Sequence, residues 1–130
     1  MWQTLIENPQ SIRAIFNDET PSLDNLSMRE VNIICGENLV CYLKFDLNEL
    51  PSIMPDKWIK SKVNTIQINL ALINSEVRFF ELNGDTQMGK LTIESNGDEK
   101  IISYSSQEKI LFVVKSRWLN VLSITGYENG

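Results

Sequence analysis

The side chains that most often carry catalysis or hold a metal are scarce in this 130-residue chain. It has no histidine, and two cysteines alone cannot complete a structural zinc site. The six glycines are isolated and form neither of the Gly-rich phosphate-binding patterns. A serine nucleophile would need lysine as its base, and no Ser-x-x-Lys falls in a helical stretch. The sequence therefore predicts no cofactor, no metal site and no nucleophilic triad.

Acidic side chains are the remaining candidates for chemistry. A sugar-hydrolysing site would need two carboxylates that converge in a cleft. The acids on or near expected strands are Glu30, Asp46, Glu49, Glu81 and Glu94. Because acids on sheets usually face water, we predict that the protein is not an enzyme. The alternative is an enzyme in which two of these carboxylates converge in a cleft and hydrolyse a sugar.

The charge of the chain is uneven along its length. Twelve Lys and Arg against 17 Asp and Glu give a net charge of −5. Nine of the acids and only three of the bases lie in residues 1–56. Such a surface disfavours nucleic acid and anionic membranes and favours a basic protein as partner, with solubility alone as the other interpretation. Lys57, Lys60 and Lys62 form a basic cluster that has only Trp58 as an aromatic neighbour. We therefore expect these lysines to face solvent at the edge of a loop and not to bind nucleic acid.

One helix and a first hairpin are expected in the N-terminal part. Apolar residues at helical spacing behind Pro9 predict a short helix that ends near Asn17. From residue 26 onward the apolar residues alternate with period two, which indicates strands. The turn at residues 36–38 predicts a hairpin with Ile33 opposite Cys41. The two cysteines then lie on a diagonal too long for a disulfide, so we expect buried free thiols.

The clearest strand is predicted for residues 65–72. A loop between Pro51 and Pro55 leads into it, and Trp58 is expected to close one end of the core. Asn74-Ser75 is read as a two-residue turn into a fourth strand at residues 77–82. In that register Leu72 would lie opposite Val77.

The C-terminal half is predicted to continue as hairpins. A turn at Asn83-Gly84-Asp85 leads to a strand at residues 88–95, and a three-residue loop at 96–98 would set Ile93 opposite Ile101. Strands then follow at residues 100–104 and 110–114, the second covered on both faces with the N-terminal helix across it. The last segment is predicted as a strand that ends near Tyr127 because of its β-branched residues, with a helix as the alternative, since Trp118, Leu119, Val121, Leu122 and Ile124 also fit helical spacing.

These elements predict a mainly β single domain over residues 1–130. About eight antiparallel strands form a meander, closed as a barrel or folded as a sandwich, with one short N-terminal helix. A barrel could instead bind a small apolar ligand, but large side chains are expected to fill the interior: Ile33, Leu43, Ile66, Ile68, Leu70, Phe79 and Ile93. The chain shows neither a signal peptide nor a membrane span, so we predict a cytoplasmic location.

Short features along nearly the whole chain resemble the immunity protein 50 family of bacterial polymorphic toxin systems. They are Trp2, Ile15-Phe16, Pro21-Ser22-Leu23 leading to Val31, Leu50-Pro51, Pro55-Asp56-Lys57-Trp58, Asn64, Ile66-Gln67-Ile68-Asn69-Leu70 and Ile124-Thr125-Gly126-Tyr127. The chain departs from the expected pattern at Glu81, where more apolar character would fit. The resemblance implies a non-enzymatic cytoplasmic protein that neutralises one cognate toxin by stoichiometric occlusion, with a generic protein-interaction module as the alternative.

The toxin-binding residues are predicted from charge asymmetry and strand phase. Acidic residues would meet a basic toxin domain and speed the encounter, and aromatic residues would supply most of the affinity. The predicted contacts are Asp18, Glu19, Asp24, Glu37, Tyr42, Asp46, Glu49, Asp56 and Phe80. Phe80 lies on a face that needs a cover, which would be either another part of this chain or a partner.

Overall fold

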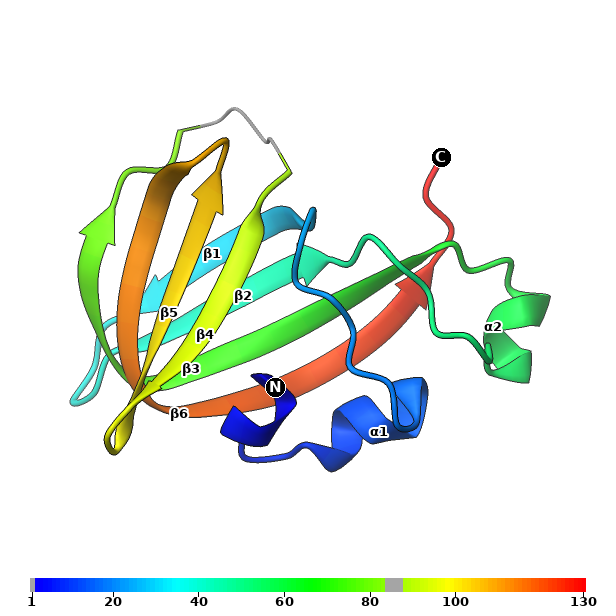
Figure 1. Cartoon of the computed structure of the whole chain (residues 1–130), viewed down its shortest axis with the longest axis horizontal. Helices are drawn as coiled ribbons and strands as arrows, with labels where there is room; N and C mark the ends of the chain where they lie inside the picture. Colours follow the sequence, from blue (N-terminus) through cyan, green and yellow to red (C-terminus); the bar gives the residue numbers. More distant parts are fainter. Residues whose placement is uncertain (1, 84–87) are drawn as a thin grey trace.

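The fold is one antiparallel sheet of six strands with three short helical segments (Figure 1), described by a computed structural model over residues 2–83 and 88–130. The strands lie side by side in the order β1-β2-β3-β6-β5-β4. Their bounds are Ser27–Ile34 (β1), Val40–Asp46 (β2), Thr65–Phe80 (β3), Lys90–Asn96 (β4), Glu99–Ser106 (β5) and Lys109–Tyr127 (β6). The helices are Trp2–Leu5 (a 3₁₀ turn, η1), Gln10–Phe16 (α1) and Asp56–Lys60 (α2).

Two long strands replace four of the predicted ones. β3 has 16 residues and β6 has 19, and they pair with each other along most of their length. The predicted turn at Asn74-Ser75 is therefore wrong, and Leu72 pairs with Leu119 instead of Val77. Asn74 does adopt a positive φ of 58°, typical of a turn, but the chain continues as a strand beyond it. Cross-strand pairing with β6 overrides the local turn preference, so the meander has six strands and not eight.

Of the two predicted arrangements, the closed barrel is wrong because the sheet is open, and the described strands form one sheet and not the two sheets of a sandwich. Beside its two edge strands, Leu26 and Gly89 form an isolated bridge, with both N···O distances at 2.9 Å, and the Leu91 N–H donates to the Leu23 carbonyl at 3.0 Å. Gly89 is required there, because a Cβ atom would lie 2.6 Å from the Tyr104 ring. Figure 1 shows the sheet bending so that β4 and β5 pass in front of β1 and β2.

The N-terminal segment covers the inner face of this bent sheet (Figure 1). Ile12 and Phe16 of α1 join the core, and the Trp2 indole donates to the Pro21 carbonyl at 2.9 Å. The Asn8 side chain docks the segment on β6 through the N–H and the C=O of Val121, at 2.9 and 2.7 Å. The N-terminal segment thus meets β6 near Val121. The predicted position of the helix, across residues 110–114, is wrong.

Large side chains fill the interior, as the sequence predicted. Leu43, Ile66, Ile68 and Leu70 are fully buried, together with Phe45, Phe112 and Tyr104 from across the sheet. The prediction is wrong for two residues: Ile33 is 38 % exposed and Phe79 is 41 % exposed. Both are exposed because they lie near the ends of their strands.

Several local predictions can be checked against the register. Ile33 pairs with Cys41 as predicted, and both cysteines are free, although Cys35 is exposed and only Cys41 is buried. Ile93 pairs with Ile102 and not Ile101, because the β4–β5 loop is one residue shorter than expected. In the predicted strand at residues 110–114, Phe112 and Val114 are buried, Leu111 and Val113 are half-buried and Ile110 is 52 % exposed, so only one face is fully covered.

The proline loop also holds a feature that the sequence did not reveal. It continues into the short helix α2, and Trp58 within this helix packs against the core as predicted. A Cβ atom on Gly126 would lie 2.9 Å from the Trp58 ring, so glycine allows this close approach. The predicted turn at Asn83-Gly84-Asp85 falls mostly outside the described residues. Within residues 2–83 and 88–130, none of the helices has the length and apolar character needed to cross a membrane.

Candidate functional site

Four of the predicted contact acids gather on two adjacent loops. The Ser22 backbone N–H donates to Glu49 Oε1 at 2.6 Å, and the Ser52 hydroxyl donates to Glu19, so residues 17–25 lie beside residues 47–55. No Lys or Arg occurs in residues 14–28 or 45–56. We call the exposed side chains of Asp18, Glu19, Asp24 and Glu49 the acidic loop surface.

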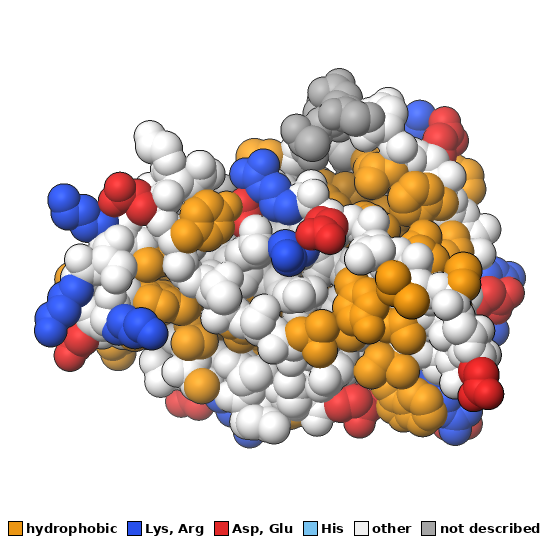
Figure 2. All heavy atoms as spheres, turned by 180° about the vertical axis from the view of Figure 1, so that it is seen from behind, with side chains coloured by type: hydrophobic (Ala, Val, Ile, Leu, Met, Phe, Trp, Pro, Cys, Tyr) orange, Lys and Arg blue, Asp and Glu red, His pale blue; other side chains and the backbone are white. Residues whose placement is uncertain are grey.

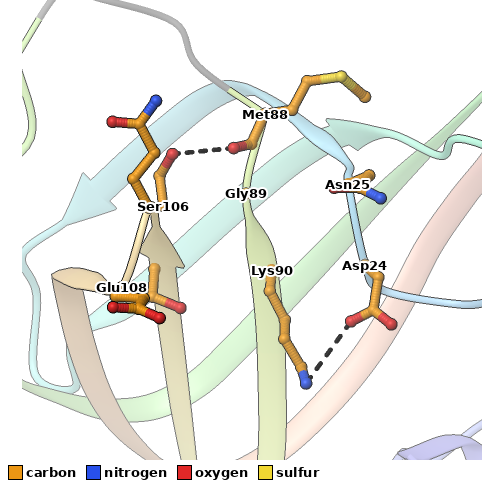
Figure 3. A pocket seen from close by; sticks show the side chains of 9 residues that line it. Asp24, Asn25, Met88, Gly89, Lys90, Ser106 and Glu108 are labelled. Carbon is orange, nitrogen blue, oxygen red and sulfur yellow. Dashed lines mark hydrogen bonds and ion pairs between the residues drawn. The ribbon is translucent and has the colours of Figure 1, made fainter.

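One of these acids has a cationic partner inside the chain. Asp24 forms an exposed ion pair with Lys90 at 3.6 Å, at the rim of a hollow of about 480 Å³ (Figure 3). On the other side of this hollow, the Ser106 hydroxyl donates to the Met88 carbonyl at 2.9 Å. Exposed ion pairs of this kind add little to stability, so Asp24 stays accessible to a stronger cationic partner.

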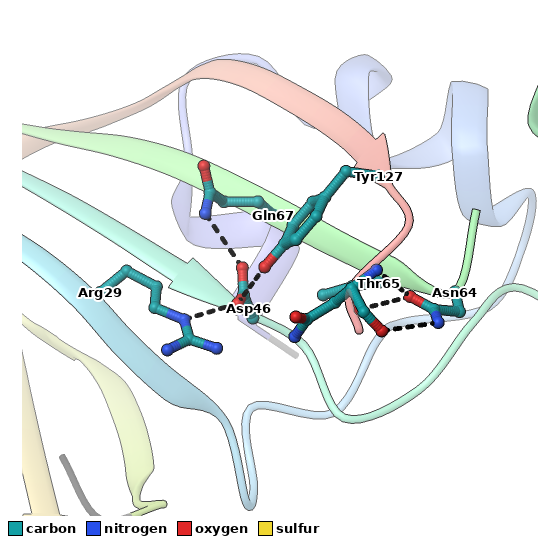
Figure 4. Close-up of polar contacts among 7 residues, drawn as sticks. Arg29, Asp46, Asn64, Thr65, Gln67 and Tyr127 are labelled. Carbon is teal, nitrogen blue, oxygen red and sulfur yellow. Dashed lines mark hydrogen bonds and ion pairs between the residues drawn. The ribbon is translucent and has the colours of Figure 1, made fainter. Parts of the chain in front are cut away.

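Asp46 differs from the other predicted acids because it is only 4 % exposed. Its carboxylate accepts hydrogen bonds from Arg29 Nε at 2.7 Å, from Gln67 Nε2 at 3.0 Å and from the Tyr127 hydroxyl (Figure 4). The hydrogen bond to Asp46 raises the pKa of Tyr127, and burial raises it further. The same carboxylate raises the pKa of Arg29. Three donors from three strands therefore use Asp46 to hold the end of the sheet together.

The neighbouring residues tie the C-terminus to the same end of the sheet. Asn64 Nδ2 donates to the Asn129 carbonyl at 3.0 Å, and the Asn129 N–H donates back to Asn64 Oδ1 at 2.8 Å (Figure 4). A hollow of about 470 Å³ lies between these residues, Arg29 and Glu49. Arg29 keeps 43 % of its side chain exposed beside it. This hollow carries both charge signs, so it does not by itself select a ligand of one charge.

The other predicted contacts lie apart from the acidic loop surface. Asp56 begins α2 next to Lys57, and Glu37 lies in the β1–β2 turn. Tyr42 is half-buried on β2, where it alternates with the buried residues Cys41 and Leu43 and so faces away from the core. Phe80 stacks on Phe112 with ring centroids 6.0 Å apart, so this chain covers part of its surface.

The outer face of the sheet carries an apolar row that the sequence did not reveal. Ile34 pairs with Val40, Val40 with Ile73, and Ile73 with Trp118, so the four side chains cross β1, β2, β3 and β6 in a line. Val40, Ile73 and Trp118 each alternate with a fully buried residue and therefore point outward, and Ile34 joins them as the register partner of Val40. Ile34 is 48 % exposed and Trp118 is 41 % exposed. We call these four residues the outer-face row.

Polar and aromatic groups surround this row. Tyr42 and Ala71 are register partners one step along the same face. The Arg117 guanidinium lies 5.1 Å from the Trp118 ring centroid, which is a cation–π contact. Figure 2 views the molecule from behind β1 and β2, and hydrophobic side chains gather over one half of this view. Period-two alternation in β1 and β2 could have revealed half of the row, but the false turn at Asn74 hid Ile73.

The chemistry available at these surfaces is binding chemistry. Among residues 2–83 and 88–130, no group of three or more His, Cys, Asp or Glu side chains is placed to hold a metal ion. Apart from Asp46, the predicted acids are solvated carboxylates, and Asp46 is fully used by donors of this chain. The fold and its surfaces define a small antiparallel-sheet protein with a filled core and with its distinctive groups on the outside.

Comparison with known families agrees with this class. The family model described as Immunity protein 50 matches residues 8–127, so the chain belongs to the immunity protein 50 family. Members of immunity families are generally inhibitors without enzymatic activity, and membership implies a toxin as partner. No curated protein and no solved structure matches the chain.

Proposed function

We propose that this protein binds and neutralises a cognate toxin domain by stoichiometric occlusion in the cytoplasm of the cell that it protects. The observation that carries the proposal is the match of the immunity protein 50 family over residues 8–127. A rigid sheet with a filled core suits this task, because a preorganised surface loses little entropy when it binds. The filled interior leaves the small-ligand alternative without a supporting observation.

The acidic loop surface is the proposed point of first contact with a basic toxin. Its four carboxylates are exposed and lie in segments that contain no Lys or Arg. Asp24 pairs with Lys90, whereas Asp18, Glu19 and Glu49 have no ion-pair partner among residues 2–83 and 88–130. Excess charge of one sign attracts an oppositely charged partner over a Debye length of about 8–10 Å and speeds association.

Glu37, Asp56 and Phe80 stay proposed contacts of lower rank. Asp46 leaves the set because it is buried, and Tyr42 leaves it because it lies beside the outer-face row, away from the acidic loop surface.

The test is co-expression with the toxin domain encoded beside the gene, with cell survival and 1:1 complex formation as readouts. We expect the wild-type chain to protect the cell and to co-purify with the toxin in equal amounts. A chain that binds without protecting, or that protects without binding, would contradict stoichiometric occlusion.

The contact surface is tested by charge reversal. Asp18→Lys, Glu19→Lys and Glu49→Lys together should lower the association rate about 10- to 100-fold at low salt. The matched control reverses three exposed acids elsewhere, Glu94, Glu108 and Glu128, which changes net charge equally. Equal slowing by both triple variants would show that only net charge matters and would reject the acidic loop surface as the contact.

A further inference from the structure

The outer-face row is an apolar surface that the described part of the chain, residues 2–83 and 88–130, leaves partly exposed. The N-terminal segment and α1 pack on the inner face, and Ile12 and Phe16 are part of the core there. On the outer face, Ile34 and Trp118 stay 48 % and 41 % exposed, although they stand in register with Val40 and Ile73. Trp, Tyr and Arg are the residues most enriched at the centres of protein interfaces, and this face presents Trp118, Tyr42 and Arg117 together.

The charges around this row nearly cancel. Lys44 pairs with Glu30 at 3.4 Å, and Lys115 lies 3.8 Å from Glu76 and 3.3 Å from Glu99. The charged residues around the row comprise four acids and five bases: Glu30, Glu37, Glu76, Glu99, Lys44, Arg78, Lys100, Lys115 and Arg117. The chain as a whole carries −5. The outer face therefore carries almost no net charge on an acidic molecule.

The small net charge of the outer face indicates which kind of partner covers the outer-face row. Two copies of a chain with net charge −5 repel each other wherever their acidic surfaces meet, whereas at a nearly neutral apolar face burial can act without that cost. A strongly basic partner would gain nothing from this face and is better matched by the acidic loop surface. We propose that a second copy of this chain covers the outer-face row and forms a symmetric dimer by face-to-face packing of the two sheets.

Twofold symmetry defines which residues meet. A symmetric interface uses the same patch on both subunits, so that residue i contacts j and j contacts i. With the axis parallel to the strands, the row meets its own reverse: Ile34 packs on Trp118 of the second copy, and Val40 packs on Ile73. Each contact then joins two apolar side chains. In the next row, Asn32 lies opposite Asn120 of the second copy, and Tyr42 lies opposite Ala71.

The size of the face sets the strength of the dimer. Four strands about 4.8 Å apart and about seven residues long give a face of roughly 20 by 23 Å. This area, roughly 460 Å² per partner, is about half of the roughly 800 Å² per partner that standard interfaces bury and is typical of weak, transient contacts. A reversible dimer is therefore expected, with dissociation that depends on protein concentration.

The first experiment measures the mass of the whole chain by sedimentation equilibrium from about 1 µM to about 1 mM, where moderate interfaces dissociate. The wild type should pass from monomer to dimer in this range. Trp118→Lys should raise the dimer dissociation constant at least about 30-fold, the effect of losing an interface hot spot. The matched control is Ile53→Lys, which adds the same charge at a 72 % exposed apolar residue off this face and should leave the constant within about twofold.

The second experiment tests the geometry independently of dimer strength. Asn32→Cys and Asn120→Cys are combined with Cys35→Ser and Cys41→Ser, and the chain is treated with a bis-maleimide that spans the ~10 Å between packed sheets. Within one chain the two introduced thiols lie three strands apart, about 14 Å, beyond the reach of that linker. Efficient covalent dimer formation is expected for the double-thiol chain. Asn32→Cys alone, in the same background, should stay monomeric because its symmetry mate lies on the far side of the interface.

Three results would overturn the proposal. One is a wild-type chain that stays monomeric to about 1 mM. Another is a dimer that Trp118→Lys leaves intact while circular dichroism shows both chains folded. The third is a chain that is monomeric throughout but loses toxin protection on Trp118→Lys, which would assign this face to the toxin. Because mass and cross-linking are measured without toxin, their outcome is distinguishable from failure of the proposed immunity function.

Discussion

The acidic loop surface and the outer-face row differ in almost every physical respect. The first consists of solvated carboxylates on loops, in segments without any Lys or Arg. The second consists of apolar side chains held in register on four neighbouring strands, with nearly balanced charges around them. Asp46, next to the loops, lies six positions along β2 from Val40 in the row, a distance of about 20 Å along an extended strand.

This difference separates two ways in which a surface can select a partner. Charges act over about 8–10 Å in physiological salt and mainly set the rate of encounter. Apolar burial acts only at contact and mainly sets how long a complex lasts. One small chain thus presents a surface suited to attract a basic partner and another suited to hold a neutral one.

The largest expected effect concerns Asp46, which lies at the end of the sheet beside the acidic loops. Asp46→Ala should lower the free energy of unfolding by about 2–4 kcal/mol, because Gln67 and Tyr127 lose their buried acceptor and Arg29 loses its partner. Chemical denaturation measures this change. Glu49→Ala, three residues further along, is the matched control and should cost at most about 0.5 kcal/mol because its side chain is exposed.

If Asp46→Ala and Glu49→Ala lowered the free energy of unfolding equally, Asp46 would behave as a surface acid. It would then no longer be distinguished, as a residue that stabilises the fold, from the acids of the acidic loop surface.

The next effect separates the two surfaces by their salt dependence. Raising the salt from about 0.05 M to about 0.5 M should slow toxin association at least about tenfold, because screening shortens the reach of the acidic loop surface. Stopped-flow kinetics measures the rate. The dimer proposed for the outer-face row should change little over the same range, since its burial is apolar and its border is nearly neutral. A dimer that dissociates as steeply with salt as the toxin complex would erase the distinction between the two surfaces.

A smaller effect is expected from pH. The pKa of Tyr127 is raised in the folded chain because its hydroxyl donates to Asp46. A raised pKa gives stability that is complete below the unfolded value of about 10 and is lost as pH rises through the folded value. Tyr127→Phe should therefore cost about 1–2 kcal/mol at neutral pH, and the difference from wild type should shrink above about pH 10.

Urea denaturation of both proteins across this pH range measures that difference. Comparing the two chains at each pH removes the effects of every other group, because those groups are the same in both chains. If the difference in unfolding free energy between Tyr127→Phe and wild type stayed constant to pH values well above 10, the protonated Tyr127 hydroxyl would not stabilise the fold by donating to Asp46.

Local patterns predicted the elements that depend on neighbours in sequence. The β1–β2 hairpin register, the N-terminal helix, the strand at residues 65–72 and the role of Trp58 were all correct. Period-two alternation and a compact turn define these elements within about 15 residues. The same logic failed at Asn74, where a residue with turn-like φ lies inside a continuous strand.

The candidate site was predictable only in part for the same reason. Charge counting located Asp18, Glu19, Asp24 and Glu49, but it also selected Asp46, whose burial depends on Tyr127 far along the chain. Nothing near residue 46 in the sequence distinguishes an acid that faces water from one that accepts three hydrogen bonds. The outer-face row was missed because its members come from four strands and meet only through register.

The sequence alone determined the mainly β class, the filled core, the charge asymmetry and the resemblance to an immunity family, because each depends on composition, alternation or short segments. Only the tertiary structure decided that β3 and β6 run unbroken, that the sheet stays open, that Asp46 belongs to the fold and that four apolar residues align on the outer face. These features depend on which strands pair across long separations, and the free energy of that pairing is not encoded in any one segment.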